Sequence, residues 1–140
     1  MAYHLKPRPE IIKSLMAGQL KGPITMLNLL KYREIADYGS SPDLAPEQEV
    51  SGTDAYKLYM QNTSKYLQKV GGEVIFLGKS SEFLIGPETE KWDTVLIVKY
   101  PSVNNFLEMI SDEGYLSGTG HRKAALEDSR LLPMEAVKGF

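Results

Sequence analysis

The chain has 140 residues, of which 42% are hydrophobic and 24% charged, with no cysteine and a formal net charge of −2. These values predict one soluble globular domain, residues 1–140, without disulfides or thiolate metal sites. The scattered basic residues argue against nucleic-acid binding, and no apolar run approaches the length of a membrane span. Because the N-terminus lacks the layout of a signal peptide, we expect a cytoplasmic location.

The first third of the chain predicts a helix, a strand and a long loop. Two early prolines favour a short helix from about Pro9 to Ala17. The apolar run from about Ile24 to Tyr32 predicts a strand. Residues 34–52 are rich in Pro, Gly, Ser and acids, and they predict a loop that is either a functional flap or partly disordered.

The middle third contains the clearest helix. Ser51 and Asp54 form a capping-box-like start, apolar residues then recur with helical spacing, and the pair Gly71-Gly72 ends the helix. A strand follows in "EVIFLGKS", and "EFLIG" is expected to continue the extended region. A second, almost continuously apolar strand is predicted in "WDTVLIVKYP".

The last third predicts a helix that Ser102 caps, a break at "DEGYLSGTG" and a short additional helix in "HRKAALEDS". The final strand is expected in "RLLPMEAV". Because Pro133 has no N–H for a sheet ladder, this strand should lie at an edge of the sheet.

The order of these elements defines an α+β fold. After the extra N-terminal helix it is β-α-β-β-α-β, the ferredoxin-like split βαβ pattern, with an antiparallel sheet in the order 4-1-3-2. Two helices can cover one face of such a sheet, yet the central strands "ITMLNLL" and "TVLIV" hardly alternate between apolar and polar residues. We therefore predict a homodimer in which two sheets pack against each other.

Three segments resemble a known family: "MLNLLKYRE" with the nearby "ADY", "GPETEKWDTVLIVKYPS", and "FLEMISDEGYLSGTGHRKAALEDSRLL". They look like uncharacterised bacterial proteins of a domain-of-unknown-function family in the dimeric α/β-barrel superfamily. The likeness covers roughly Thr25 to Leu132. It implies a ferredoxin-like protomer and a dimer that joins sheets, but no particular activity.

Better-known members of that superfamily are cofactor-independent monooxygenases, haem-degrading monooxygenases and small lactone isomerases, with a pocket between helices and sheet. Some of these monooxygenases use a first-strand Asn with a Trp and sometimes a His. The counterparts here would be Asn28, Trp92 and His121, although His121 lies beyond the second helix, which departs from the haem-degrading pattern. This is an analogy of fold.

The residue types and their positions also suggest polar candidates, independently of the resemblance. Asn28 is a polar group in an apolar strand, where it either orients a substrate oxygen or is simply hydrogen-bonded inside the core. His121 could exchange protons and Arg122 could hold a carboxylate, or the arginine could pair with Asp93 or Asp128. These alternatives stay open.

Tyrosines and a tryptophan complete the candidates. Tyr32 at a strand end, Tyr59 on the apolar helix face and Tyr115 before His121 could line a ligand cleft, although core packing explains them equally. Trp92 could cap the pocket or fill the dimer interface. We expect no metal site, since the chain has two histidines and no dense acid cluster, and no cofactor.

The sequence thus predicts a cytosolic homodimer with a small-molecule pocket. As an enzyme it would be a cofactor-independent monooxygenase or isomerase of a small acidic or phenolic metabolite. His121 and Asn28 would be catalytic, and substrate would be bound by Arg122, Tyr32, Tyr59, Trp92 and Tyr115. The alternative is a non-catalytic dimeric module that binds a ligand or a protein and whose polar groups are structural.

Overall fold

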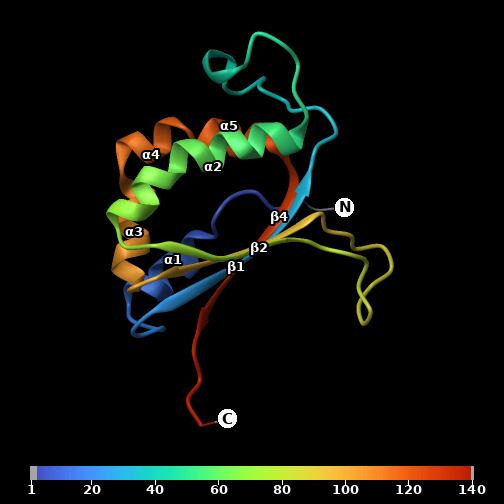
Figure 1. Ribbon diagram of the computed structural model, residues 1–140. Helices are drawn as coiled ribbons and strands as arrows, with labels where there is room; N and C mark the ends of the chain where they lie inside the picture. Colours follow the sequence, from blue (N-terminus) through green and yellow to red (C-terminus); the bar gives the residue numbers. More distant parts are fainter. Residues whose placement is uncertain (1–2, 140) are drawn as a thin grey trace.

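Four antiparallel strands form one sheet in the order β2-β3-β1-β4 (Figure 1). The computed structural model describes residues 3–139. Its elements are α1 (Pro9–Met16), β1 (Ile24–Tyr32), the 3-10 turn η1 (Pro42–Leu44), α2 (Gly52–Lys69), β2 (Glu73–Lys79), β3 (Thr94–Tyr100), α3 (Val103–Ser111), α4 (Glu113–Ser117), α5 (Thr119–Ala125) and β4 (Leu126–Glu135). None of the helices within this part of the chain is long and apolar enough to cross a membrane.

The predicted topology is confirmed. The order 4-1-3-2 is this sheet read from its other edge, so β1 and β3 are central and β4 is an edge strand. Pro133 lies in β4 opposite Met26, and the missing N–H costs no ladder bond because one side of an edge strand has no partner. The fold is the ferredoxin-like split βαβ pattern with α1 added in front.

The core lies between the sheet and the helices α2 to α5, which cover one face (Figure 1). Alternate residues of β1 point into it, so that Ile24, Met26 and Leu30 are almost fully buried. Leu96 and Val98 of β3 join them from the neighbouring strand, because residues directly opposite each other in a ladder share a face.

The opposite face of the sheet, which we call the outer face, is apolar as well. Leu27 of β1 lies opposite Leu132 of β4 and Ile97 of β3, and Leu29 lies opposite Val95. These five residues and Phe76 of β2 stay partly or largely exposed, and no helix of the described chain lies on this side (Figure 1). Both faces of the central strands are therefore built for burial, as the missing alternation predicts.

Three boundaries differ from the expected ones. The last strand begins at Leu126, four residues earlier than expected, because Leu126, Asp128 and Ser129 extend the ladder with β1. Glu113–Ser117 forms the short helix α4 where a break was expected, with the Asp112 side chain accepting a bond from Gly114 N. Residues 82–86 belong to no strand and instead lie in the connection between β2 and β3.

The first half of β4 also has a long-range partner. Asp128 Oδ1 accepts a hydrogen bond of 2.8 Å from His4 N, and Ser129 Oγ donates one of 2.6 Å to His4 O. The N-terminal segment thus lies along β4, more than 120 residues away in the sequence. These bonds hold the N-terminal segment against the first half of β4, where Asp128 and Ser129 pair with Lys31 and Leu30 of β1.

The long loop after β1 is folded against α5. Ala36 N donates to Val50 O and Asp37 N donates to Ala124 O, both over 2.9 Å. Gly120 of α5 lies so close to Ser41 and Leu44 that a Cβ there would overlap them. The loop therefore covers the outer side of α5 with a defined backbone.

Candidate functional site

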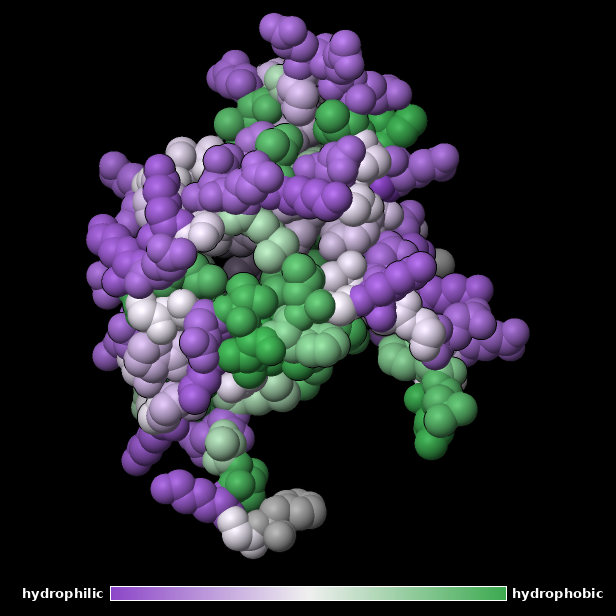
Figure 2. Space-filling model, viewed as in Figure 1, coloured by the Kyte–Doolittle hydropathy of each residue, from purple (hydrophilic) through white to green (hydrophobic). Residues whose placement is uncertain are grey.

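An open cleft lies between the first half of α2 and the end of the sheet where β1 finishes. It has two adjoining hollows of about 470 and 270 Å³, and both are lined by Tyr32, Thr53, Lys79 and Thr94. Figure 2 shows the surface hollowed between α2 and the apolar surface over β2. Pockets for small molecules usually lie in such a position, between layers of secondary structure.

Close backbone packing holds the walls of the cleft together. Gly52 N donates to Arg33 O, and Arg33 N donates to Ala125 O, so the start of α2, the end of β1 and the end of α5 meet at one point. A Cβ on Gly52 would collide with both carbonyl oxygens. Ser51 Oγ caps α2 by accepting a bond of 3.0 Å from Asp54 N, as its sequence predicts.

The larger hollow, which forms the mouth of the cleft, is lined by two basic side chains, Arg33 and Lys79, and by the acidic side chains of Glu34 and Asp93. Arg33 lies at the end of β1 and Lys79 at the end of β2, and neither has an ion-pair partner among residues 3–139. Asp93 also lines the mouth, but its Oδ2 accepts a bond of 2.8 Å from Tyr32 N. Lys31, which the same strand end supplies, pairs with Glu127 at 3.1 Å instead.

A row of four tyrosines leads inward from this mouth. The ring centroids of Tyr32 and Tyr56 are 5.7 Å apart, those of Tyr56 and Tyr59 are 5.2 Å apart, and those of Tyr59 and Tyr115 are 6.3 Å apart. The hydroxyls of Tyr59 and Tyr115 share a hydrogen bond of 2.7 Å. The structure thus brings together three residues that the sequence analysis proposed, Tyr32, Tyr59 and Tyr115.

Burial raises the pKa of Tyr32, Tyr56 and Tyr115 above the ordinary value for a phenol, and the positive charge of Arg122 opposes this for the last two. All three hydroxyls therefore keep their protons at neutral pH. A protonated phenol can donate a hydrogen bond, and Tyr32 is the one of the three whose side chain lines the open cleft without being fully buried, while Tyr115 is engaged with Tyr59.

Asn28 points toward the helices, on the same face as Met26 and Leu30. Its Nδ2 donates to Leu96 O over 3.1 Å and lies 3.5 Å from Met26 O. Within the described residues its Oδ1 has no hydrogen-bond partner, yet the side chain is only partly buried. The amide is thus half engaged, with its donor bound to backbone and its acceptor free.

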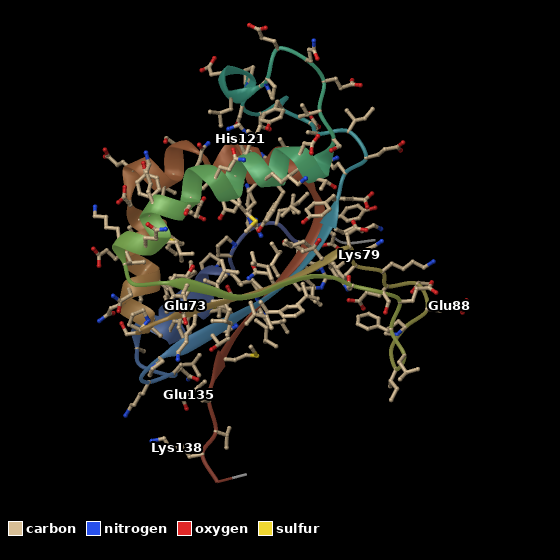
Figure 3. All side chains as sticks on the ribbon, in the orientation of Figure 1. Glu73, Lys79, Glu88, His121, Glu135 and Lys138 are labelled. Atoms are coloured by element: carbon tan, nitrogen blue, oxygen red, sulfur yellow. The ribbon has the colours of Figure 1, made fainter. Side chains whose placement is uncertain are left out.

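His121 faces a different neighbour. Its Nδ1 shares a hydrogen bond of 2.6 Å with the Tyr38 hydroxyl, and the two rings meet edge to face. Figure 3 places His121 on the side of the helix layer that faces the loop after β1, and no described contact joins it to Asn28. Burial lowers the pKa of His121, which keeps the ring neutral near pH 7.

Arg122 and Trp92 are also held by neighbours. Arg122 donates to Leu5 O over 3.1 Å and to Ser129 Oγ over 3.3 Å, so neither Asp93 nor Asp128 is its partner. Trp92 lies under the guanidinium of Arg130, 4.8 Å from the ring centroid, and its Nε1 donates to Glu90. The alternative that Arg122 pairs with Asp93 or Asp128 is therefore wrong, because Asp93 accepts a bond from Tyr32 N and Asp128 pairs with Arg130 at 2.8 Å.

The sequence analysis missed Thr53, Lys79 and Thr94 in the lining. Lys79 and Thr94 are opposite each other in the ladder between β2 and β3, and Thr94 also pairs with Leu30. Because the predicted topology places these strand ends next to each other, the sequence already indicates that Lys79 and Thr94 lie close to Tyr32. Among residues 3–139, no group of three or more His, Cys, Asp or Glu side chains is placed to hold a metal ion.

The fold and the cleft define a ferredoxin-like domain with an open pocket between helix and sheet. The chain belongs to the family described as Domain of unknown function (DUF1330), whose model matches residues 46–137. No curated protein matches the chain.

Two crystal structures of RPA0582, a protein of unknown function from Rhodopseudomonas palustris, are similar over nearly the whole chain. The methylated protein has a TM-score of 0.86 and 40% identity, covering 99% of this chain and 98% of its own. The other has a TM-score of 0.84 and 38% identity, covering 98% and 99%. SnoaB from Streptomyces nogalater, a cofactor-independent oxygenase, has a TM-score of 0.50 and 11% identity, covering 84% and 96%, and shares the fold alone.

Proposed function

We propose that the chain binds a small aromatic or phenolic metabolite with an acidic group in the cleft between α2 and the sheet. The observation that carries the proposal is the pairing of an aromatic wall with basic side chains at the mouth. Tyr32, Tyr56 and Met60 offer apolar surface to a ring, and Lys79 lies beside them. A carboxylate on the ring would reach Lys79 or Arg33, whose charges have no ion-pair partner among the described residues.

Thermal unfolding in the presence of 4-hydroxybenzoate tests this proposal. A probe at a hundred times its dissociation constant stabilises the folded state by about 2.7 kcal/mol, which raises the melting temperature by about 5–10 °C. We expect Lys79→Met to abolish most of this shift, because it removes the charge and keeps the stem. Lys13→Met, a matched change on α1 away from the cleft, should leave the shift unchanged.

The methyl ester of the same acid separates ring binding from charge recognition. If the ester stabilises the chain as well as the acid does, the acidic part of the proposal fails. If hydroxybenzoates and their esters all leave the melting temperature unchanged, the phenolic part fails too.

We further propose a homodimer that joins the outer faces of two sheets. The support is the apolar surface of Leu27, Leu29, Val95 and Ile97, which no element of residues 3–139 covers. A sheet that stays open to water on one face is polar on that face. The second sheet would supply the missing cover.

The finer proposal is that the pocket is catalytic, with cofactor-free oxygenation or isomerisation as the chemistry. In such an oxygenation the substrate supplies every electron: a CH₂ group beside a phenol ring loses a proton, and the carbanion and O₂ combine to a hydroperoxide. Loss of the second proton from the same carbon then breaks the O–O bond, so that one oxygen becomes the carbonyl and the other leaves as water. The free Oδ1 of Asn28 and the protonated tyrosines support this proposal, because they are groups that orient a substrate. Arg122 as anion holder and His121 as proton acceptor stay predictions.

Oxygen consumption tests the catalytic proposal, with a phenol that carries an acidic CH₂ group beside its ring. Asn28→Ala and His121→Gln are each expected to lower kcat by about a hundredfold or more. Rates that are the same in both variants and in the unmodified chain would exclude these roles.

A non-catalytic binding module is the second candidate. It is favoured by the hydrogen bonds of His121 with Tyr38, of Arg122 with Leu5 and Ser129, and of Tyr59 with Tyr115, which give these groups structural partners. In this case the ligand would bind at the cleft with the same dependence on Lys79, and no turnover would follow.

A further inference from the structure

The connection between β2 and β3 projects from the body of the chain and ends in exposed apolar side chains. We call residues 81–91 the arm. Leu84 is 99% exposed and Ile85 is 92% exposed, while the root of the arm is fixed by the bond of Ser80 Oγ to Trp92 O and the ion pair of Lys91 with Glu82. A fixed root with a bare apolar tip is typical of a segment that docks on another molecule.

Residues 136–139, which we call the tail, project in a similar way. They follow β4 and carry Val137, which is 74% exposed. Figure 1 shows that the arm and the tail both leave the sheet on the side away from the helices, and Figure 2 shows the apolar end of the arm standing clear of the body. Both segments therefore flank the outer face, where we propose that the second sheet packs.

The register places the arm and the tail at diagonally opposite corners of the sheet. The arm lies beside the pair Lys79 and Thr94, at the edge formed by β2 and at the end of the sheet where β1 finishes. The tail follows Glu135 of the other edge strand, β4, and Glu135 is opposite Ile24, the first residue of β1.

This arrangement selects one relation between two packed sheets. Suppose that a two-fold axis lies between the two sheets and runs along the diagonal that joins the other two corners, those without arm or tail. Rotation about this axis brings the arm of each protomer beside the tail of its partner. The strands of the two sheets then cross at nearly a right angle, one of the two ways in which sheets pack face to face. An axis parallel or perpendicular to the strands would place each arm away from both tails.

The chemistry of the two segments is complementary. The arm has three glutamates and one lysine, and Glu88 has no ion-pair partner among the described residues. The tail has Lys138, which likewise lacks one there, and Figure 3 labels Glu88 on the arm and Lys138 on the tail. The apolar tip of the arm would thus contact Val137, and Glu88 would lie near Lys138.

We propose that the arm docks on the tail of a second copy of this chain, and that each homodimer has two such contacts outside the packed sheets. This inference rests on the proposed homodimer. It adds the orientation of the two protomers and an arm–tail contact that occurs twice in each dimer.

Cysteine cross-linking tests the contact directly, because the chain has no cysteine of its own. Under mild oxidation at micromolar concentration, the double variant Leu84→Cys/Val137→Cys is expected to run as a covalent dimer on a non-reducing gel. An equimolar mixture of the two single variants should give a covalent heterodimer. The control Met16→Cys/Val137→Cys, with an exposed residue of α1 in place of the arm, should stay uncross-linked.

A second measurement follows the dissociation of the dimer by sizing at decreasing concentration. Leu84→Asp/Ile85→Asp is expected to raise the dissociation constant at least about tenfold, while Met16→Asp leaves it unchanged. A covalent dimer from Leu84→Cys alone would overturn the diagonal axis, because it would place the two arms together.

The outcomes separate the two proposals. If the unmodified chain is a monomer at micromolar concentration, the proposed homodimer fails and the arm contact fails with it. If the unmodified chain is a dimer, but the cysteine pair does not cross-link and the arm variant keeps the same dissociation constant, the arm contact alone fails.

Discussion

At the scale of single residues, Asn28 shows how a polar group is kept inside an apolar strand. Its Nδ2 donates to Leu96 O, and its Oδ1 has no hydrogen-bond partner among residues 3–139. The strand pattern establishes that Asn28 shares a face with Met26 and Leu30, and the structure shows that this is the helix face. The residue therefore lies on the side of the proposed pocket and away from the proposed dimer interface.

The variant Asn28→Asp tests how much the hydrogen bond from Nδ2 to Leu96 O contributes to the free energy of unfolding. The carboxylate would face Leu96 O without a proton to share, so we expect the free energy of unfolding to fall by about 1–3 kcal/mol. Urea unfolding at neutral pH checks it. Asn104→Asp, the same change at an exposed position of α3, should stay within about 0.5 kcal/mol, and an equal loss in both variants would contradict the role of the bond.

The buried tyrosines predict a loss of stability in alkali. Burial raises the pKa of Tyr56 and Tyr100 far above the value of about 10 in an unfolded chain. Below pH 10 both states keep the proton. Above it the unfolded state releases the proton and the native state does not, so stability falls as pH rises, by about 1.4 kcal/mol per pH unit for each group.

Urea unfolding between pH 8 and pH 11 measures this slope. Tyr56→Phe is expected to make it shallower by about 1.4 kcal/mol per pH unit, because one proton fewer is released. Tyr3→Phe, at an exposed position, serves as the control and should keep the original slope. An unchanged slope in Tyr56→Phe would contradict the raised pKa.

At the scale of elements, the cleft depends on how closely α2 approaches the end of β1. Gly52 begins the helix, and its backbone lies against the carbonyl oxygens of Arg33 and Ala125. Three elements that are distant in sequence converge there, and the lining residues Tyr32 and Thr53 lie next to the contact. A side chain at position 52 would separate the walls.

Gly52→Ala is therefore expected to lower the free energy of unfolding by about 3 kcal/mol and to weaken any ligand bound in the cleft. Gly118→Ala is the matched control, because a Cβ there finds its nearest neighbour at 3.4 Å. Thermal unfolding of both variants gives the comparison. A Gly52→Ala chain as stable as the control would show that the contact is not tight.

How far the sequence predicts each element depends on where its stabilising partners lie. The bounds of β1 follow from its own apolar pattern, and the cap of α2 follows from Ser51 and Asp54. The start of β4 does not, because "LEDS" resembles a helix end, whereas its strand partners Leu30 to Tyr32 and its contact His4 lie far away in the sequence. The orientation of His121 likewise depends on Tyr38, 83 residues away, in a loop without a periodic pattern.

At the scale of the whole molecule, the sheet needs burial on both faces. Helices cover one face, while Leu27, Leu29, Val95 and Ile97 stay accessible on the other. A contiguous accessible apolar patch on a sheet normally marks an interface. The proposed homodimer and the arm contact both follow from this asymmetry.

The melting temperature should therefore rise with protein concentration, because association stabilises the folded state by mass action. Leu29→Asp, in the middle of the outer face, is expected to give a monomer that keeps its circular dichroism spectrum and melts at a temperature independent of concentration. Leu116→Asp on α4 is the control at an exposed apolar position. Light scattering reads the mass, and a Leu29→Asp dimer would exclude sheet packing.

The order of strands in the sheet also constrains how the chain acquires its structure. β1 is the first strand made, but its partners β3 and β4 are residues 94–100 and 126–135. Until those segments have been synthesised, an almost wholly apolar strand has no ladder on either side, and the bonds from His4 to β4 cannot form. The whole segment from β1 to β4 must therefore be synthesised before the sheet closes, and until then β1 must stay unaggregated.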